Sequence, residues 1–303
     1  MAGYVAYFNG DWVPLSDVKI DPTDRGFYVG DSVFEVVRTF GGKSFRMKEH
    51  IDRLYRSLCF ARIDSGLSAE EMVEVSEEAV RRNQHMLAEA GDFNIHQFVT
   101  RGKGRRAWQA SEPTVCVRIG PLDFGNYANA YDSGLHAVVT KVLSYPPEAL
   151  DPKIKHYSRM NFNLAEIESN DVDDDALPVL RDERGNLTEG SGYNVFLVTD
   201  GAIRTAGDRS ILQGVSRGMV YDLARQLEIP VSEEELQPYD LYTADEAFFA
   251  STTWCMVPVT HVDKRPIGDG RPGPVTTQLI AAWSEAVGID IVGQAVEFAN
   301  RAG

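Results

Sequence analysis

Cysteine is scarce in this chain of 303 residues, and basic side chains are outnumbered. The three cysteines, Cys59, Cys116 and Cys255, are far apart and each lies in an apolar stretch. This pattern favours buried thiols in a reducing cytoplasm over a disulfide framework. With 45 acidic against 30 basic side chains, the formal charge is −15. Such a charge disfavours sequence-independent binding to nucleic acid or to an anionic membrane surface, and we attribute it to solubility.

Long apolar segments, targeting signals and metal-ligand spacings are also missing. No run approaches the roughly 20 apolar residues that a transmembrane helix needs. The first residues do not pair a basic segment with an apolar one, so no signal peptide is expected. The six histidines form no short-spaced pair with Cys, Asp or Glu of the zinc-binding type. The sequence therefore predicts a cytoplasmic protein with no membrane partner, no nucleic-acid partner and no metal.

The composition is that of a globular protein, and the length allows one large domain or two ordinary ones. Hydrophobic residues make up 43% and charged residues 25% of the chain. Asn9-Gly10 predicts a hairpin, and Ser68 with Glu71 predicts a capping box at a helix start. The turn-rich segment 121–134 predicts a linker between a domain over 1–120 and a larger one over 135–303. Strands are predicted over 32–40, 95–100, 114–119, 135–143, 176–180, 194–198, 202–205 and 247–251, and helices over 48–61, 68–87, 161–170, 216–227 and 275–287. Mixed elements in both halves indicate an α+β fold.

Four separated motifs carry candidate chemistry. Lys155 lies in DPKIKHY, an apolar and aromatic setting that can lower the pKa of a lysine. Glu189 begins EGSGYN, where an acid precedes small residues and a buried strand. Ser216 follows Gly214 at a predicted helix start, a potential anion site. Thr252 lies in STTW at a strand end. Each has a plainer structural explanation alone: a surface lysine, a turn glutamate, a helix cap and a strand terminus.

Together these motifs supply the parts that a pyridoxal phosphate enzyme needs: a Schiff-base lysine, a partner for the pyridine nitrogen and a phosphate cradle. No GxGxxG, GxxxxGK[ST] or G-x-S-x-G motif competes with this interpretation. The sequence resembles the fold-type IV pyridoxal phosphate enzymes over nearly its whole length. The resemblance rests on GDSVFEVVR (30–38), EHIDRL (49–54), EGSGYN (189–194), LQGVSR (212–217) and the run 251–258. It implies two domains, the larger one a pseudo-barrel.

The resemblance also implies roles for individual residues. Lys155 resembles the lysine that forms the Schiff base, with Lys153 as its rival; a spacing of 34 residues to Glu189 favours Lys155. Glu189 would pair with the pyridine nitrogen, and Leu212 would pack on the ring. The remaining cofactor contacts would bind the phosphate: Arg53, Val215, Ser216 and Thr252.

The residues expected at the substrate are mixed in character. The family's D-amino-acid enzymes hold the α-carboxylate with an arginine, a histidine and a tyrosine. Here Arg106 keeps the arginine, whereas Trp108 and Phe34 replace the other two. A site altered in this way accepts an uncharged substituent more readily than the site of the D-amino-acid enzymes does. Arg38 is a second candidate for a carboxylate, and Thr253 and Trp254 would line the pocket, with Trp254 narrowing one side.

The sequence therefore predicts a ping-pong transaminase acting through a Lys155 Schiff base, with an (R)-amine or a D-amino acid and a keto acid as substrates. The resemblance also implies a homodimer in which a loop from the neighbouring subunit completes the site. A branched-chain L-amino-acid aminotransferase is the alternative. A third is an aminodeoxychorismate-type lyase, to which KHYSR (155–159) is similar, although GDSVFEVVR departs from that pattern. A protein that binds the cofactor without turnover is the non-enzyme alternative.

Overall fold

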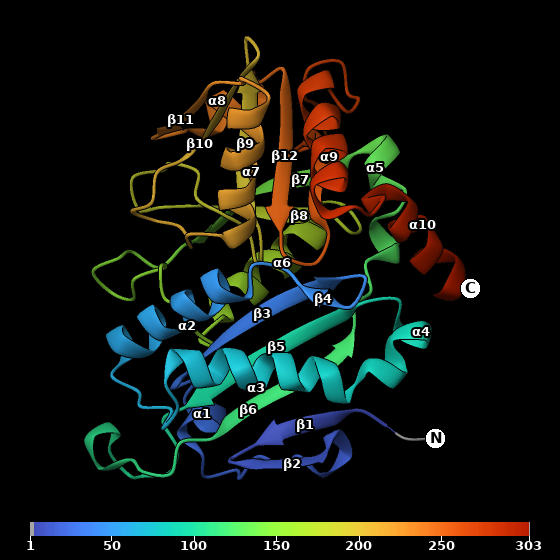
Figure 1. The fold of residues 1–303 in the computed structure, drawn as a ribbon. Helices are drawn as coiled ribbons and strands as arrows, with labels where there is room; N and C mark the ends of the chain where they lie inside the picture. The colour runs from blue at the N-terminus through green and yellow to red at the C-terminus, as the bar shows by residue number, and fades with distance from the viewer. Residues whose placement is uncertain (1–2, 303) are drawn as a thin grey trace. The chain divides into compact units, whose positions relative to one another are not determined.

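The computed structural model describes residues 3–302, arranged in two compact units. The first unit comprises Met1–Leu122 and Ile154–Arg159, and the second comprises Asp123–Lys153 and Met160–Gly303. The chain therefore leaves the first unit after Leu122 and returns to it for six residues before continuing in the second. Figure 1 follows this course from blue to red.

The first unit is a six-stranded antiparallel sheet in the order β2-β1-β6-β5-β3-β4. Two helices, α2 (Met47–Ala61) and α3 (Ala69–Arg82), cover one face of it (Figure 1). The strands are β1 (Val5–Phe8), β2 (Asp11–Pro14), β3 (Ser32–Phe40), β4 (Lys43–Ser44), β5 (Phe93–Thr100) and β6 (Val115–Pro121). Short helices complete the unit: η1 (Leu15–Asp17), α1 (Arg25–Tyr28), η2 (Gln84–Met86), α4 (Leu87–Ala90) and η3 (Ala107–Gln109).

Strand alternation divides the sheet of the first unit into two faces. In β5, Phe93, Ile95 and Val99 are completely buried. Gln97 shares their face and donates a hydrogen bond to Ser76 Oγ of α3 at 3.0 Å. The odd-numbered residues of β5 therefore face the helices, and the even-numbered ones point to the other face.

The predicted helix over 68–87 is shorter in the structure than in the prediction. Its capping box is confirmed, because Ser68 Oγ accepts from Glu71 N–H at 3.1 Å and the Glu71 carboxylate accepts from Ser68 N–H at 2.7 Å. The helix ends at Arg82 because the Asn83 side chain bonds the main chain instead. Its Nδ2 donates to Ala79 O and to Val5 O, both at 2.8 Å. An asparagine amide that satisfies main-chain groups competes with helix continuation.

The second unit is built on a mixed eight-stranded sheet in the order β11-β10-β9-β12-β13-β7-β8, with β14 paired to β13. The strands are β7 (Leu135–Leu143), β8 (Leu177–Arg181), β9 (Asn194–Thr199), β10 (Ala202–Ala206), β11 (Val231–Glu234), β12 (Glu246–Ser251), β13 (Cys255–Val262) and β14 (Arg265–Pro266). The helices are η4 (Gly125–Tyr127), α5 (Ala130–Ser133), α6 (Met160–Val172), α7 (Val215–Gln226), α8 (Pro238–Tyr242), α9 (Pro274–Val287) and α10 (Ile291–Ala302). Figure 1 shows α7 and α9 beside β12.

The two ends of this sheet are joined by the segment that contains Glu189. Leu180 N–H of β8 donates to Glu189 O at 3.1 Å, and Leu187 N–H donates to Leu236 O, just beyond β11, at 2.6 Å. The sheet thus curls toward closure, as the pseudo-barrel expectation requires. The core includes Phe196 and Phe248, stacked across β9 and β12 with centroids 4.9 Å apart.

The segment 121–134, predicted as a linker, contains ordered structure of the second unit. Phe124 is completely buried and meets Phe298 of α10 edge to face at 5.3 Å. Tyr131 of α5 donates its hydroxyl proton to Trp254 O at 2.6 Å. Because these apolar and hydroxyl groups have partners in the second unit, the turn-rich sequence folds onto it. The helix α10 was not predicted, and neither was the return of 154–159 to the first unit.

Apolar helices of the second unit include no single span of membrane length. Within residues 3–302, only the pair α9 and α10 together reaches such a length and composition, and an 85° bend separates the two.

Candidate active site

Lys155 lies on a short extended segment that is hydrogen bonded to the edge of the first unit's sheet. Its carbonyl accepts from Phe34 N–H of β3 at 2.9 Å, and its own N–H donates to Ser57 Oγ of α2 at 3.2 Å. Two residues on, Tyr157 N–H donates to Ser32 O at 3.2 Å. The backbone that carries the lysine is therefore fixed to both β3 and α2. The rival Lys153 belongs to the second unit, and its Nζ pairs with Asp151 Oδ1 at 3.1 Å.

We name the sheet face opposite α2 and α3 the lysine face, defined by Lys155, Phe34, His96 and Arg118. Lys155 Nζ lies over the Phe34 ring, 4.6 Å from its centroid. The Tyr157 ring stacks on the same Phe34 ring with centroids 4.2 Å apart. A cation over an aromatic face is stabilised by the ring quadrupole. Phe34 thus limits where the lysine amine lies and places an uncharged ring beside it.

His96 and Tyr157 share a hydrogen bond on the lysine face, with 2.6 Å between Nε2 and the phenolic oxygen. Burial, together with the charges of Arg118 and Lys155, lowers the pKa of His96 to about 3. Burial also raises the pKa of Tyr157 above its ordinary value. The imidazole is therefore neutral and the phenol protonated near neutral pH, so the pair brings no charge close to Lys155.

Because burial keeps His96 and His156 neutral in the folded protein, we expect the free energy of unfolding to fall in mild acid. Burial lowers the pKa of His156 to about 4, and that of His96 to about 3, against about 6.5 in an unfolded chain. At a pH between the folded and unfolded pKa values, the unfolded chain binds more protons than the folded one. The contribution of these histidines to the free energy of unfolding is therefore fully present above about pH 6.5 and is lost as the pH falls below that value. Urea unfolding at pH 7.5 and at pH 5 measures how steeply the free energy of unfolding depends on pH. The variant His96→Gln, which keeps a hydrogen-bonding side chain, is expected to flatten it.

The exposed histidine His85 provides the matched control for this experiment. His85→Gln should keep the wild-type dependence of unfolding free energy on pH. If His96→Gln and wild type have the same slope, the imidazole is not the group that titrates on unfolding.

Arg53, the predicted phosphate ligand, is one member of a buried ionic cluster on the opposite face. It lies on α2 three residues after His50, so both side chains project from one side of the helix. Its Nε and Nη2 donate to Glu35 of β3 at 2.9 and 2.6 Å, and His50 Nδ1 lies 3.0 Å from Glu35 Oε1. Burial opposes ionisation of Glu35, but Arg53 and His50 outweigh it and hold its pKa well below the ordinary value. Glu35 is therefore a carboxylate that orients Arg53.

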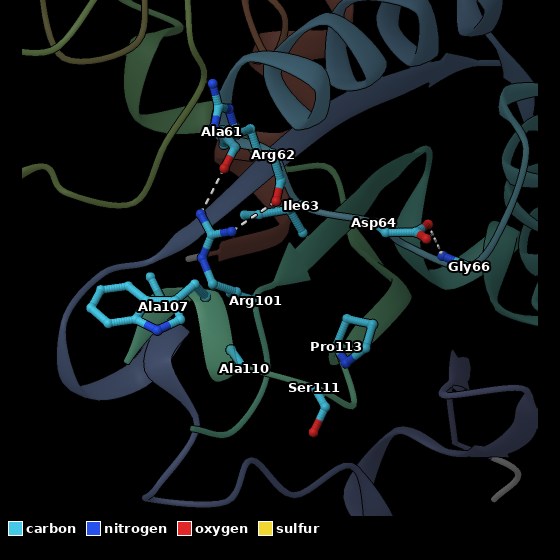
Figure 2. A pocket seen from close by; sticks show the side chains of 11 residues that line it. Ala61, Arg62, Ile63, Asp64, Gly66, Arg101, Ala107, Ala110, Ser111 and Pro113 are labelled. Atoms are coloured by element: carbon cyan, nitrogen blue, oxygen red, sulfur yellow. Dashed lines mark hydrogen bonds between the residues drawn. The ribbon is translucent and has the colours of Figure 1, made fainter. Parts of the chain in front are cut away.

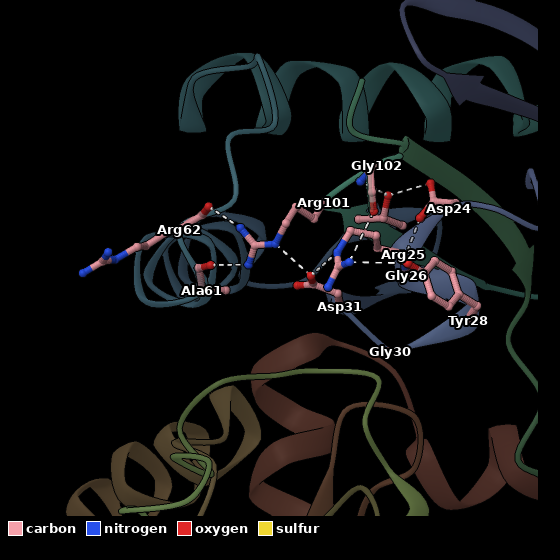
Figure 3. A network of polar contacts seen from close by, with 12 residues as sticks. Asp24, Arg25, Gly26, Tyr28, Gly30, Asp31, Ala61, Arg62, Arg101 and Gly102 are labelled. Atoms are coloured by element: carbon pink, nitrogen blue, oxygen red, sulfur yellow. Dashed lines mark hydrogen bonds and ion pairs between the residues drawn. The ribbon is translucent and has the colours of Figure 1, made fainter. Parts of the chain in front are cut away.

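The C-terminal end of α2 is capped by Arg101, which precedes the predicted substrate loop. Arg101 Nη1 donates to Arg62 O at 2.7 Å, and Nη2 donates to Ala61 O at 2.6 Å. Its Nε donates to Asp31 at 2.8 Å, and Asp31 also accepts from Arg25 Nε at 2.9 Å (Figure 3). A guanidinium at a helix C-terminus satisfies the last carbonyls and opposes the helix dipole. The loop base is thus tied to the helix that carries Arg53.

The loop after Arg101 lines a cavity of about 710 Å³ between itself and the end of α2 (Figure 2). Trp108 lines this cavity while 80% of its surface is exposed, and the Arg106 guanidinium lies 5.7 Å from the Trp108 ring. Neither Lys155 nor Phe34 lines the cavity. The structure therefore places Arg106 and Trp108 together, but at a cavity separate from Lys155.

Arg38, the other carboxylate candidate, is on β3 and almost fully buried. Its Nε donates to Thr39 O at 3.2 Å, and its guanidinium carbon lies 3.8 Å from the centroid of the Phe40 ring. These contacts hold the guanidinium along its own strand.

In the second unit, Glu189 is buried and bonded to the loop before α7. Its Oε2 accepts from Leu212 N–H at 2.9 Å, and Asn194 Nδ2 donates to Leu212 O at 3.0 Å. The glycine after Glu189 has a packing reason: a Cβ on Gly190 would lie 2.0 Å from the Tyr193 ring. Tyr193 in turn stacks on Phe249 with centroids 4.4 Å apart. The absence of a side chain at Gly190 therefore leaves room for the Tyr193 ring next to the residue that carries the acid.

The start of α7 has the properties of an anion site. Gly214 is its N-cap and offers no side-chain hydrogen bond, so the plainer explanation of Ser216 as the cap does not hold. Val215 and Ser216 instead are the first two helical residues, whose N–H groups have no intrahelical acceptor. A Cβ on Gly214 would lie 2.1 Å from Asn194 Oδ1. Leu212, whose N–H donates to the Glu189 carboxylate, lies just before the start of α7 in the chain. The carboxylate and the helix start are therefore held close together.

The hydroxyl motif forms the turn between β12 and β13. Thr252 and Thr253 are half-buried there. Trp254 is buried and packs at a tilt on Tyr127 and Tyr193, with centroids 5.5 and 5.8 Å apart. Trp254 is thus part of the second unit's aromatic core, which explains its size.

Four residues near the predicted ones were missed: Glu35, His96, Tyr157 and Arg118. A glutamate inside the apolar run SVFEVVRTF signals a buried ionic partner. The alternation of β5 and β6 places His96 and Arg118 on one face, as their direct pairing confirms. Within residues 3–302, no three His, Cys, Asp or Glu side chains are grouped to hold a metal ion.

Comparison with known proteins adds the family context. The family described as Amino-transferase class IV matches residues 32–262. A putative branched-chain-amino-acid aminotransferase of Methanocaldococcus jannaschii is 37% identical, covering 90% of this chain and 93% of that protein. A D-alanine aminotransferase of Listeria monocytogenes is 32% identical, covering 92% and 94%. A branched-chain amino acid aminotransferase from T.th., solved with pyridoxamine 5'-phosphate, is similar in structure, with a TM-score of 0.87, 29% identity and coverage of 98% and 96%.

Proposed function

Because the chain belongs to the class IV aminotransferases, which use pyridoxal phosphate, we propose that it moves an amino group between an (R)-amine or D-amino acid and a keto acid. The observation that carries the substrate proposal is Phe34, an uncharged ring directly beside Lys155 Nζ. An apolar wall at this position favours substrates with an apolar substituent. A branched-chain L-amino acid is the second candidate, favoured by the relative from M. jannaschii and by the solved structures.

The residues of this chain fit the cofactor. When bound, pyridoxal phosphate supplies an electron-withdrawing ring that stabilises negative charge on the substrate carbon. Glu189 is buried and would hold the proton on the ring nitrogen. The open helix start at Val215 and Ser216 suits the phosphate, aided by Thr252 and Arg53, and Leu212 would pack on the ring. In this proposal Arg53 acts with its orientation fixed by Glu35.

Lys155 is the residue that we propose moves the proton at the substrate carbon. Its backbone is fixed by hydrogen bonds to β3 and α2, and the Phe34 ring limits where Nζ lies. Fixing a catalytic amine before the reaction removes an entropic cost from the proton transfer. The His96–Tyr157 pair, being neutral, adds no charge that would compete with this role.

We also propose a cytoplasmic homodimer in which Arg106 and Trp108 serve the partner's site. Large apolar side chains are exposed on both units. On the first these include Phe27 and Phe60, 69% and 61% exposed, besides Trp108. On the second, Met160, Leu164 and Ile167 form a stripe along α6 at helical spacing. Exposed apolar clusters of this kind are typical of protein interfaces. The three cysteines are free thiols, as the cytoplasm favours; Cys116 and Cys255 are buried as predicted, whereas Cys59 is exposed on α2, which corrects that part of the prediction.

The test is a half-reaction followed by absorbance. Protein loaded with pyridoxal phosphate is mixed separately with (R)-1-phenylethylamine, D-alanine and L-leucine, without a keto acid. Conversion of the cofactor to its pyridoxamine form by the first or second amine, faster than by L-leucine, is the expected result. Conversion by L-leucine alone would assign the protein to the branched-chain enzymes. Turnover that needs no amino acceptor and releases pyruvate would indicate the lyase instead.

A further inference from the structure

Arg118 is an arginine of the lysine face that the proposed function does not use. It lies on β6 directly opposite His96 of β5, and His96 in turn lies opposite Val36 of β3. Adjacent strands are about 4.8 Å apart, so β6 lies roughly 10 Å across the sheet from β3. The His96 ring meets the Phe34 ring edge to face with centroids 5.7 Å apart, and Lys155 Nζ lies over that same Phe34 ring.

The Arg118 guanidinium has no anionic partner in the part of the chain that the structure describes. Among residues 3–302 it forms no ion pair and no hydrogen bond, although the side chain is half-buried. Its Nη1 lies 3.9 Å from where a Cβ on Gly120 would stand, so it extends along its own strand over a glycine. Arg38, by contrast, is buried against Phe40 and donates to a main-chain carbonyl. Of these two arginines of the sheet, Arg118 is the one with donors available.

A second polar group beside Arg118 also lacks a partner. Asn94 lies opposite Gly120, the residue over which the guanidinium extends. Its Oδ1 is buried and has no hydrogen-bond partner among the described residues. Buried polar atoms in folded proteins are nearly always hydrogen bonded, so this buried acceptor points to a hydrogen-bond donor supplied by a ligand or a bound water. An arginine fork next to an amide is well suited to a planar carboxylate.

We propose that Arg118 binds the carboxylate of the amino-acid or keto-acid substrate, with Asn94 beside it. The inference rests on the proposed function and deepens it, because it assigns carboxylate recognition to the lysine face of the same chain. The neutral His96–Tyr157 pair separates the guanidinium from Lys155 without competing for the anion. Phe34 and Val36 supply the apolar surface for the rest of the substrate.

The experiment compares Arg118→Met, Arg118→Lys and wild-type holoenzyme. Dissociation constants of two non-reacting acids, 4-methylvalerate and glutarate, are measured by titration calorimetry, and 4-methylpentan-1-ol serves as the uncharged analogue. Loss of a charge-assisted hydrogen bond is expected to weaken acid binding in Arg118→Met by about 10- to 100-fold. Binding of the alcohol should be unchanged, and Arg118→Lys should restore part of the loss. Half-reaction rates should fall for D-alanine or L-leucine but not for (R)-1-phenylethylamine.

The matched control is Arg81→Met, which removes the same charge from the exposed surface of α3. It should bind both acids as wild type does. Unchanged acid binding in Arg118→Met would overturn the inference, as would an equal loss for the alcohol and the acids, which would indicate a structural role. Because binding of non-reacting acids needs no turnover, these outcomes are distinct from a wild-type protein that converts none of the three amines, which would refute the proposed function.

Discussion

Replacement of Lys155 by alanine is expected to lower the half-reaction rate by about 10⁴-fold or more, the order of loss seen when an enzyme's nucleophile is removed. The physical reason is that Lys155 is the amine that the fold holds on the lysine face: it is bonded to β3 and α2 through its main chain and lies over Phe34. Stopped-flow absorbance of the half-reaction measures the rate. Borohydride treatment followed by peptide mass analysis shows which lysine carries the cofactor covalently.

Lys153→Ala is the control, because it removes an amine two residues away that pairs with Asp151. It should retain the covalent label and most of the rate. A label on Lys153, or a Lys155→Ala variant that converts amines at the wild-type rate, would show that the lysine assignment is wrong.

Replacement of Glu35 by leucine is expected to lower the free energy of unfolding by about 3–5 kcal/mol, the usual cost of breaking a buried ion pair on one side. The substitution leaves the buried guanidinium of Arg53 without its two charged contacts of 2.9 and 2.6 Å. It also removes the acceptor of His50. Urea denaturation at neutral pH measures the change.

The exposed pairs of Glu78 with Arg81 and Arg82 provide the comparison. Glu78→Leu breaks ion pairs of the same chemistry in solvent and should cost less than about 1 kcal/mol. A similar, small loss in both variants would contradict the view that the Glu35 cluster is a desolvated ionic centre. If Glu35→Leu also weakens cofactor binding, the orientation of Arg53 is the link between the two.

Local patterns along the chain predicted most of the second unit's elements and the motifs around Glu189. Gly190 explains part of this, because it leaves room for the Tyr193 ring within the same motif. The helix starting at Val215 was predicted from its apolar face and confirmed within one residue. Features of this kind, which depend on residues within one motif or one helix, can be predicted from the sequence alone.

The contacts around Lys155 could not be predicted in the same way. Lys155 meets Ser57 and Phe34, which are about a hundred residues earlier in the chain. Tyr157 meets His96, which lies 61 residues earlier. The edge pairing that brings them together has no local signature, because the return of 154–159 to the first sheet is decided by tertiary packing. For the same reason Arg118 could not be predicted, because its position opposite His96 depends on the pairing of β6 with β5.

The six residues that return to the first unit have a consequence for the order of events during synthesis. When the ribosome has released residues 3–122, the sheet of the first unit is complete except for the segment next to β3. The amine of the lysine face arrives only after the chain has begun the second unit. Neither unit corresponds to one uninterrupted stretch of gene, so recombination at a single point cannot exchange one of them intact. The two units are therefore expected to be inherited together, although each folds around a core of its own.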